Sequence, residues 1–308
     1  MSAILPICWR WLAAVLLCVI PASEVAATEP KQVLLLLSEQ HVAYQHFRQA
    51  FEQNLPSDVR LEVRTLAQQA DMPRADILVT AGSKAAQWAT GQWRGAMLAT
   101  MLPSKSFKQM QSQRALPNPM SALFIDQPLL RQVALLRAAL PSLKKVGVLY
   151  TAGGDFDPHP LQRELERQGA QLVTRAVQPD DNLSGKLEEL LIQSEILLAV
   201  PDSNIYNSST IRNILLGSYR RGIPMIGLSA AYVSAGALCA VYSTPEQQAA
   251  QSAAMVSDFL HRGVMPPPGF PRLYRIVLNA EVARSMRFNI RSVEALRIEI
   301  DRAEGSRQ

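Results

Sequence analysis

Cysteine is scarce in this sequence, with three residues in 308. Two of them, Cys8 and Cys18, lie in an amino-terminal segment that we expect to be removed, which leaves Cys239. One cysteine forms neither an intramolecular disulfide nor a thiolate zinc cluster. Because Cys239 stands inside an apolar run, we interpret it as a small buried core residue.

Blocks of basic residues are also missing. The net charge is +5, but Lys and Arg are scattered, and no run of them resembles the footprint of a nucleic-acid-binding protein. We therefore expect a solvated basic surface and no nucleic-acid partner. With 48% hydrophobic residues, the chain has enough apolar surface for one large domain or for two lobes with their own cores.

The motifs of common enzymes are absent. The sequence has no G-x-S-x-G nucleophile elbow, no HExxH helix, no Walker loop and no G-x-G-x-x-G turn. One loop alternates Asp155, Asp157 and His159, a donor set that suits a divalent metal, but no fourth ligand is evident. We therefore expect no enzyme activity, no cofactor and no resident metal.

The amino terminus is typical of a secretory signal. A basic residue precedes the apolar run Trp11–Ile20, which is too short for a comfortable membrane span. Because Val25–Ala27 offers a small-x-small cleavage pattern, we expect residues 1–27 to be a cleaved signal peptide and the mature chain to be periplasmic. The alternative is a lipoprotein signal with Cys18 as the lipidated residue, although Leu17 before it is not small.

The most informative stretch is Ile196–Tyr242. Its apolar runs Ile196–Val200, Pro224–Leu228 and Ala237–Val241 are each followed by polar residues, and a helix fits between the first two. Continuous apolar runs predict strands buried on both faces, as in a parallel sheet covered by helices. Ligands of such sheets bind at the carboxyl ends of the strands, so we expect the functional residues there.

The rest of the chain repeats this α/β pattern. Further strands are predicted at residues 32–37, 61–65, 76–80, 96–101, 121–125, 146–150, 171–177 and 272–278, with helices between them. The region Lys105–Pro119 has little periodicity and two prolines, and it is predicted to be a surface loop. A βαβα run thus occurs twice, divided near Ser121–Asp126, which predicts two lobes of about a hundred residues each.

The order of these motifs resembles the ABC-transporter substrate-binding proteins of the type 1 periplasmic-binding class, in the branch that includes binders of aromatic amino acids. The similarity is clearest over Gln132–Ile290. It is carried by the segments LLRAALPSLKKVGVLY, AVPDSNIYNSS, RGIPMIGLSAAYVSAGALCAVY and LNAEVARSMRFNI, and more loosely by ILVTAGSKAAQWAT in the first half. Each motif alone is weak, and their order and spacing carry the match.

The resemblance implies an α/β fold of two doubly wound, Rossmann-like lobes joined by hinge crossovers. The first lobe would comprise residues 28–124 with 244–263, and the second 125–243 with 264–290. Residues 291–308 would form a charged tail. In this family a small molecule binds in the cleft and the lobes close on it, a hinge motion driven by the ligand's preference for the closed state.

Candidate ligand-binding residues follow from the strand ends. They are Ser38, Glu39 and Ser83 in the first lobe, and Tyr150, Asp202, Ser203, Asn204, Ser229 and Tyr242 in the second. Ser83 could present its hydroxyl and backbone N–H to a ligand carboxylate at a helix N-terminus. Each candidate has a structural alternative, for example as a helix cap, a turn residue or a core aromatic.

The resemblance also brings out a departure. Amino-acid binders of the family usually carry acidic residues near the positions of Ser229 and Tyr242, where they would hold an ammonium group. Here those positions are Ser229 and Tyr242-Ser243, which argues against an α-amino-acid ligand. Asp202 is the acidic residue kept at a strand end.

The function that we expect is that of a monomeric periplasmic protein that captures a small-molecule solute between its lobes for an ABC-type importer. Its membrane partner would be the permease of that importer. The alternative is a binding-protein-like sensor or co-receptor, which would signal to a membrane partner and feed no permease. An adjacent permease gene favours the first interpretation, and an adjacent sensor kinase or cyclase gene favours the second.

Overall fold

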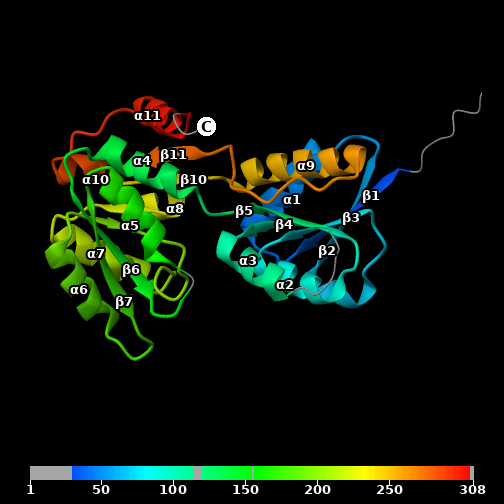
Figure 1. Ribbon diagram of the computed structural model, residues 1–308, viewed down its shortest axis with the longest axis horizontal. Coiled ribbons are helices and arrows are strands. Elements are labelled where there is room, and N and C mark those ends of the chain that lie inside the picture. Colours follow the sequence, from blue (N-terminus) through cyan, green and yellow to red (C-terminus); the bar gives the residue numbers. More distant parts are fainter. Residues whose placement is uncertain (1–29, 114–118, 155, 306–308) are drawn as a thin grey trace, which may run out of the picture. The chain divides into compact units, whose positions relative to one another are not determined.

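The computed structural model describes residues 30–113, 119–154 and 156–305. The expected signal segment, with Cys8 and Cys18, lies outside these ranges. The described chain forms two separate β-sheets, each flanked by helices (Figure 1). Within the described ranges, no helix is both long and apolar enough to cross a membrane.

The first sheet has five parallel strands in the order β2-β1-β3-β4-β5. The strands are β1 (Lys31–Leu37), β2 (Val59–Thr65), β3 (Ile77–Ala81), β4 (Ala96–Leu102) and β5 (Met120–Phe124). The helices are α1 (Val42–Asn54), the 3₁₀ helix η1 (Leu66–Asp71), α2 (Ser83–Gln92), α3 (Ser104–Gln113) and, from later in the chain, α9 (Pro245–Arg262). Helices α1 and α9 pack side by side on one face, and α2 and α3 cover the other (Figure 1).

The second sheet has six strands in the order β11-β10-β9-β8-β6-β7. They are β6 (Lys145–Thr151), β7 (Gln171–Val177), β8 (Ile196–Leu198), β9 (Met225–Gly227), β10 (Cys239–Tyr242) and β11 (Arg275–Leu278), of which β11 is antiparallel to β10. The helices are α4 (Leu129–Ala139), α5 (Pro158–Arg167), α6 (Leu183–Gln193), α7 (Ile211–Arg220), α8 (Ala230–Ser234), α10 (Ala280–Ser285) and α11 (Val293–Gly305). Helix α4 packs next to α5, and α6 packs next to α7.

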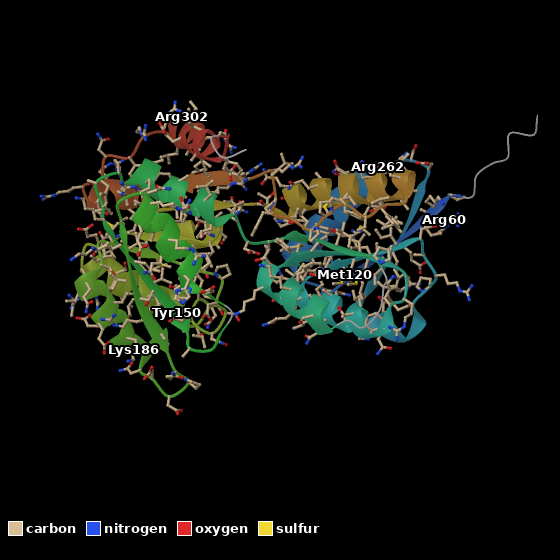
Figure 2. The ribbon with its side chains drawn as sticks, in the orientation of Figure 1. Arg60, Met120, Tyr150, Lys186, Arg262 and Arg302 are labelled. Atoms are coloured by element: carbon tan, nitrogen blue, oxygen red, sulfur yellow. The ribbon has the colours of Figure 1, made fainter. Side chains whose placement is uncertain are left out.

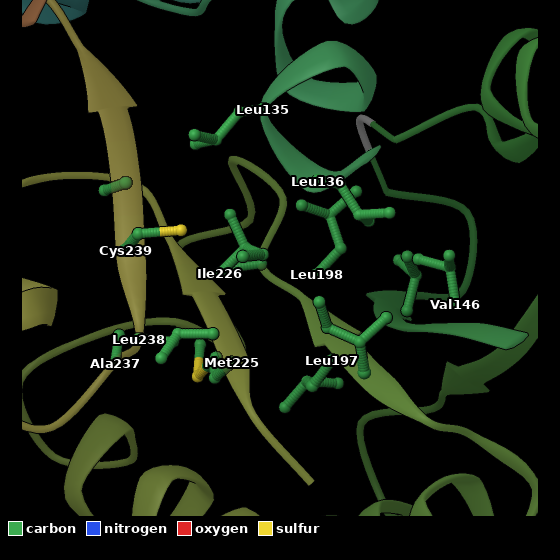
Figure 3. Close-up of a cluster of buried hydrophobic side chains, with 14 of the residues drawn as sticks. Leu135, Leu136, Val146, Leu197, Leu198, Met225, Ile226, Ala237, Leu238 and Cys239 are labelled. Atoms are coloured by element: carbon green, nitrogen blue, oxygen red, sulfur yellow. The ribbon is translucent and has the colours of Figure 1, made fainter. Parts of the chain in front are cut away.

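The core of the second sheet explains why its sequence is so continuously apolar. Leu135 and Leu136 of α4 lie over the central strands and meet Leu198 and Ile226 (Figure 3). Cys239 lies in this cluster without exposed surface, and burial raises the pKa of its thiol to about 12. The expectation that Cys239 is a buried core residue is confirmed, because a thiol so hard to ionise is chemically inert.

The strand orders confirm the predicted fold class. In each sheet the chain starts at an inner strand, β1 or β6, adds one strand to one side and then winds to the other side. This is the doubly wound, Rossmann-like pattern, and it occurs twice. The chain passes from one sheet to the other three times: after β5, after β10 and after α9.

One predicted loop is wrong. The pattern of Lys105–Pro119 predicts no regular structure, but α3 covers Ser104–Gln113. Phe107 and Met110, three positions apart, are buried against the sheet beside Phe124. The helix is otherwise polar, so its apolar stripe is only two residues wide and too short to register as helical periodicity.

The start of α3 is stabilised by a residue from outside the helix. The Asp126 carboxylate accepts hydrogen bonds from the backbone N–H of Ser104 at 2.8 Å and from its hydroxyl at 2.6 Å. Asp126 thus accepts the hydrogen bond that an N-cap side chain normally accepts at a helix start, but it lies 22 positions away in the sequence. A local capping pattern was therefore not available to predict the helix.

The three crossover segments are joined by one hydrogen-bond network. Gln127, after β5, donates from its amide nitrogen to the Ser243 hydroxyl at 3.0 Å, and Ser243 follows β10. Ser243 in turn donates to the Leu273 carbonyl at 2.6 Å, in the third crossover. The Arg131 guanidinium, on α4, donates to the Gln127 side chain at 2.8 Å and to the Pro271 carbonyl at 2.7 Å.

The same guanidinium also holds the C-terminal helix α11. Arg131 donates two parallel hydrogen bonds to the Glu304 carboxylate, at 2.8 and 3.0 Å, and its side chain is only 5% exposed. The guanidinium carbons of Arg131 and Arg297 both lie over the ring of Tyr274, at 4.2 and 4.5 Å from its centroid. The Tyr274 hydroxyl donates to Asp301 of α11. Helix α11 is therefore part of the packing around the second sheet.

Replacing Arg131 by Ala should lower the free energy of unfolding by about 3 kcal/mol, because it leaves the Gln127 amide oxygen, the Pro271 carbonyl and the Glu304 carboxylate without their donor. Arg302→Ala is the matched control. Arg302 lies on α11, is 68% exposed and pairs with Glu299 in solvent, so its loss should change stability by less than about 0.5 kcal/mol (Figure 2). Urea unfolding measures both variants, and equal effects would contradict the argument.

Candidate functional site

Asp202 follows β8 at the carboxyl edge of the second sheet, where the sequence places it. It is 8% exposed, and both carboxylate oxygens are engaged. One oxygen accepts from the Thr151 backbone N–H at 2.6 Å, and the other accepts from the Thr151 hydroxyl at 2.9 Å and the Asn204 N–H at 3.1 Å. Asp202 thus joins the end of β6 to the loop after β8, which gives it a structural role.

The other candidates in that loop face solvent. Ser203 and Asn204 are exposed, and both of their carbonyls accept hydrogen bonds from the side-chain amide of Asn207, at 2.9 and 3.3 Å. These contacts are those of a polar turn, which agrees with the structural alternative for both residues. The loop is anchored at one end by Asp202 and is closed internally by Asn207.

The two candidate tyrosines are both half-buried. Tyr150 ends the buried part of β6 and packs against Phe156, with the ring centroids 5.6 Å apart (Figure 2). Tyr242 is the last residue of β10 and packs against the core of the second sheet. Each ring therefore presents one side to the core and keeps part of its surface accessible at the strand end.

The first-sheet candidates gather at the start of α2. The hydroxyl of Ser38, after β1, accepts a hydrogen bond from the Ala85 N–H at 3.0 Å, and Glu39 pairs with Lys84 at 3.4 Å. Ser83 is exposed and is the first residue of α2, whereas Gly82 holds the N-cap position. The structural alternative for Ser83, that of a helix cap, is therefore wrong. Ser38 supplies the hydroxyl acceptor that the N-terminus of α2 needs.

Gly82 makes this arrangement possible. Its φ of +95° lies in a region that L side chains rarely adopt, and a Cβ there would collide with the Tyr44 and Ser38 hydroxyls. Burial is the main cause that raises the pKa of Tyr44, and the nearby Glu39 charge adds to it. The turn from β3 into α2 therefore leaves no space for a side chain at position 82.

Gly82→Ala should destabilise the protein by more than about 1 kcal/mol, since the new methyl group meets two fixed hydroxyls in a strained backbone conformation. Gly91, also in α2, has open space around it, with no neighbouring atom within 4 Å of the place that a methyl group would take. Gly91→Ala should therefore stabilise the helix or leave it unchanged. Thermal unfolding of both variants decides the point; a neutral Gly82→Ala would show that the turn can relax.

A pocket of about 240 Å³ opens at the carboxyl edge of the second sheet. Most of its wall is apolar and comes from the ends of β8, β9 and β10. The lining residues are Ile125, Asp126, Gln127, Gln132, Leu198, Ala199, Pro201, Ile226, Gly227, Leu228, Ser229 and Val241. Of the residues predicted from the sequence, only Ser229 lies in this wall, as the N-cap position of the short helix α8.

Asp126, Gln127 and Gln132 are the polar members of the pocket that the sequence did not indicate. Asp126 follows β5, so it does stand at a strand end, but its place before a proline suggested only a helix start. Burial raises the pKa of its carboxyl, and the two hydrogen bonds from Ser104 partly offset this. Gln132 lies on α4 and lines the pocket from the helix side.

The loop with alternating acidic residues has a local explanation. The Asp157 carboxylate accepts a hydrogen bond from the His159 N–H at 3.0 Å and so caps α5. Asp155 lies outside the described residues. Among the residues that are described, no group of three or more His, Cys, Asp or Glu side chains is placed to hold a metal ion.

Asp202→Ala should cost about 2 kcal/mol of stability, because it removes the buried carboxylate and leaves the half-buried Thr151 N–H and hydroxyl without their acceptor. Asp180→Ala, in the exposed turn after β7, removes the same charge and should have little effect. Urea unfolding compares the two. A stable Asp202→Ala variant would return this residue to the list of ligand-binding candidates.

Comparison with known proteins identifies the class. The sequence profile described as ABC transporter substrate binding protein matches residues 125–279, half of the chain, and the matched segment contains the second sheet and its pocket. The chain belongs to the ABC transporter substrate binding protein family. This family is a substrate-binding class and not an enzyme class. No curated protein matches the sequence significantly.

Solved structures show the same fold. A conserved domain protein from Vibrio cholerae superposes with a TM-score of 0.62 at 19% identity, over 88% of this chain and 98% of that one. An ABC domain from Streptococcus pneumonia in complex with L-Trp gives 0.63 at 15% identity, over 87% and 97%. A ligand-free, open substrate-binding protein with adhesive properties from Clostridium difficile gives 0.66 at 16% identity, over 86% and 97%.

Proposed function

We propose that this chain is a periplasmic solute-binding protein that captures a small molecule at the carboxyl edges of its two sheets and delivers it to the permease of an ABC importer. The observation that carries the proposal is the pocket of about 240 Å³ at the end of β8 and β9, in a chain that belongs to a substrate-binding family. Apolar walls with a few convergent polar groups are typical of small-molecule sites.

The polar groups of the site divide into two kinds. Asp202 and Ser38 are used by the fold, because Asp202 accepts hydrogen bonds from Thr151 at the end of β6 and Ser38 accepts one from Ala85 in the first turn of α2. Ser229 makes no capping hydrogen bond through its side chain, so its hydroxyl is available to a solute. The pocket therefore supports solute contacts by Ser229, and by Asp126 and Gln132 beside it.

Ligand-induced stabilisation tests the proposal. In a thermal-shift screen against amino acids, sugars, purines, organic acids, amines and metal ions, at least one solute should raise the melting temperature. A ligand that binds only the folded state adds about 2.7 kcal/mol at a hundred times its dissociation constant. A Ser229→Ala variant should weaken the hit, while Ser203→Ala, in the exposed turn, should not.

A cooperatively folding protein that no solute stabilises would contradict solute capture and favour the sensor or co-receptor alternative. Two further measurements address the rest of the proposal. Cell fractionation should place the protein in the periplasm with residues 1–27 removed, and light scattering of the purified protein should give the mass of a monomer. Retention of the full-length amino terminus would contradict the secretory interpretation.

A further inference from the structure

The pocket of the second sheet has room for an apolar group of defined size. An apolar cavity of about 150 Å³ holds a benzene molecule, and this one measures about 240 Å³. Leu198, Ala199 and Ile226, which form part of its wall, have at most 1% of their surface exposed. The wall is therefore held by the core and does not collapse easily, which favours a ring or a branched aliphatic chain as the group that enters.

The charge of the pocket wall is carried by one residue. Asp126 is the one ionisable side chain among the twelve lining residues, all of which are described. The guanidinium of the nearby Arg131 lies behind this wall, where it donates to the side chain of the lining residue Gln127, to the Pro271 carbonyl and to the Glu304 carboxylate, and Arg131 itself does not line the pocket. The Asp126 carboxylate accepts hydrogen bonds from the N–H and hydroxyl of Ser104, which carry no charge. Among the described residues, the one cation that acts on it is Lys108 of α3, whose charge lowers the pKa of this carboxyl and which is not among the residues that line the pocket.

The Asp126 carboxylate can accept more hydrogen bonds than Ser104 donates to it. Its two oxygens offer about four acceptor sites, and two of these are used by Ser104. Burial disfavours its charged form, and the Ser104 hydrogen bonds and the Lys108 charge offset only part of that cost, so the pKa of the carboxyl stays raised. No cation is among the residues that line the pocket. A positively charged ligand group would supply a partner charge from inside the pocket, whereas a ligand carboxylate would meet a like charge and no basic residue of the pocket wall.

We infer that the solute is an apolar ammonium compound, whose ring or branched chain fills the pocket of the second sheet and whose ammonium group binds Asp126. Ser229 and Gln132 contribute uncharged hydrogen-bonding groups around it. The ammonium site is thus in the crossover after β5 and not at Ser229 or Tyr242. This inference rests on the proposed function, and it narrows the solute class.

Four probes with one shared ring test the inference: 2-phenylethylamine, 2-phenylethanol, 3-phenylpropanoate and phenylalanine. A second set built on the 3-methylbutyl group covers a branched-chain solute. Isothermal titration of the purified full chain near pH 7 should show that the amine binds at least tenfold more tightly than the alcohol of the same set. The acid and the amino acid should bind more weakly than the amine, because each brings a carboxylate.

Asp126→Asn is the decisive variant. It keeps an oxygen that can accept from Ser104 but removes the charge, so the tenfold preference for the amine over the alcohol should disappear while alcohol binding is retained. Asp180→Asn, in the exposed turn after β7, is the matched control for net charge and should keep the preference. Thermal unfolding and circular dichroism establish that both variants are folded.

The outcomes separate this inference from the proposed function. Equal binding of amine and alcohol, tighter binding of an acid or amino acid, or an amine preference that survives Asp126→Asn would each overturn the ammonium site. If none of the eight probes binds but another solute from the thermal-shift screen does, solute capture stands and the inference falls. If no solute binds at all, both fall.

Discussion

The buried guanidinium of Arg131 is the contact on which the arrangement of the crossovers depends. A guanidinium has five N–H donors and cannot lose its charge, so a buried one is tolerated only where acceptors surround it. Here the acceptors come from Gln127 in the first crossover, Pro271 in the third and Glu304 at the end of α11. Because Ser243 joins Gln127 to the third crossover, a shift in any one of these segments breaks a hydrogen bond in another. The C-terminal helix is therefore part of what fixes the conformation of all three connections.

Much of this fold could be predicted from the sequence, and the failures have a common cause. The central strands are continuous apolar runs such as Val33–Leu37, and such runs predict strands that are buried on both faces of a sheet. The sequence does not predict helix α3, because its apolar stripe is short and its N-terminus is stabilised by Asp126 from another part of the chain. The role of Arg131 was equally hidden, since an arginine among helical leucines usually extends to solvent. Each missed feature depends on a partner that is distant in sequence, and periodicity carries no information about such partners.

The candidate site shows the same limit more sharply. The rule that function lies at the carboxyl ends of parallel strands led to Asp202 and Ser229, and the structure places both residues at that edge. The rule does not distinguish a carboxylate whose oxygens are used by hydrogen bonds within the fold from a carboxylate that lines a pocket. Asp202 is surrounded by backbone and hydroxyl donors, whereas Asp126 combines two such donors with an apolar pocket. That difference is set by which loops meet, so it became visible only in the structure.

The position of Asp126 bears on how binding and conformational change are coupled. Asp126 lies in the crossover between β5 and α4, next to Gln127, whose side chain belongs to the Arg131 network. A solute whose charge is on Asp126 and whose apolar group is in the second sheet would contact both a connecting segment and a rigid wall. Ligands shift a conformational equilibrium only through interactions that differ between its states. In the proposed function, a wall made by the sheet alone would interact equally in all states that preserve the sheet. Discrimination between states would then come from the connecting segment, and Asp126 is the charged group of the pocket wall that lies in that segment.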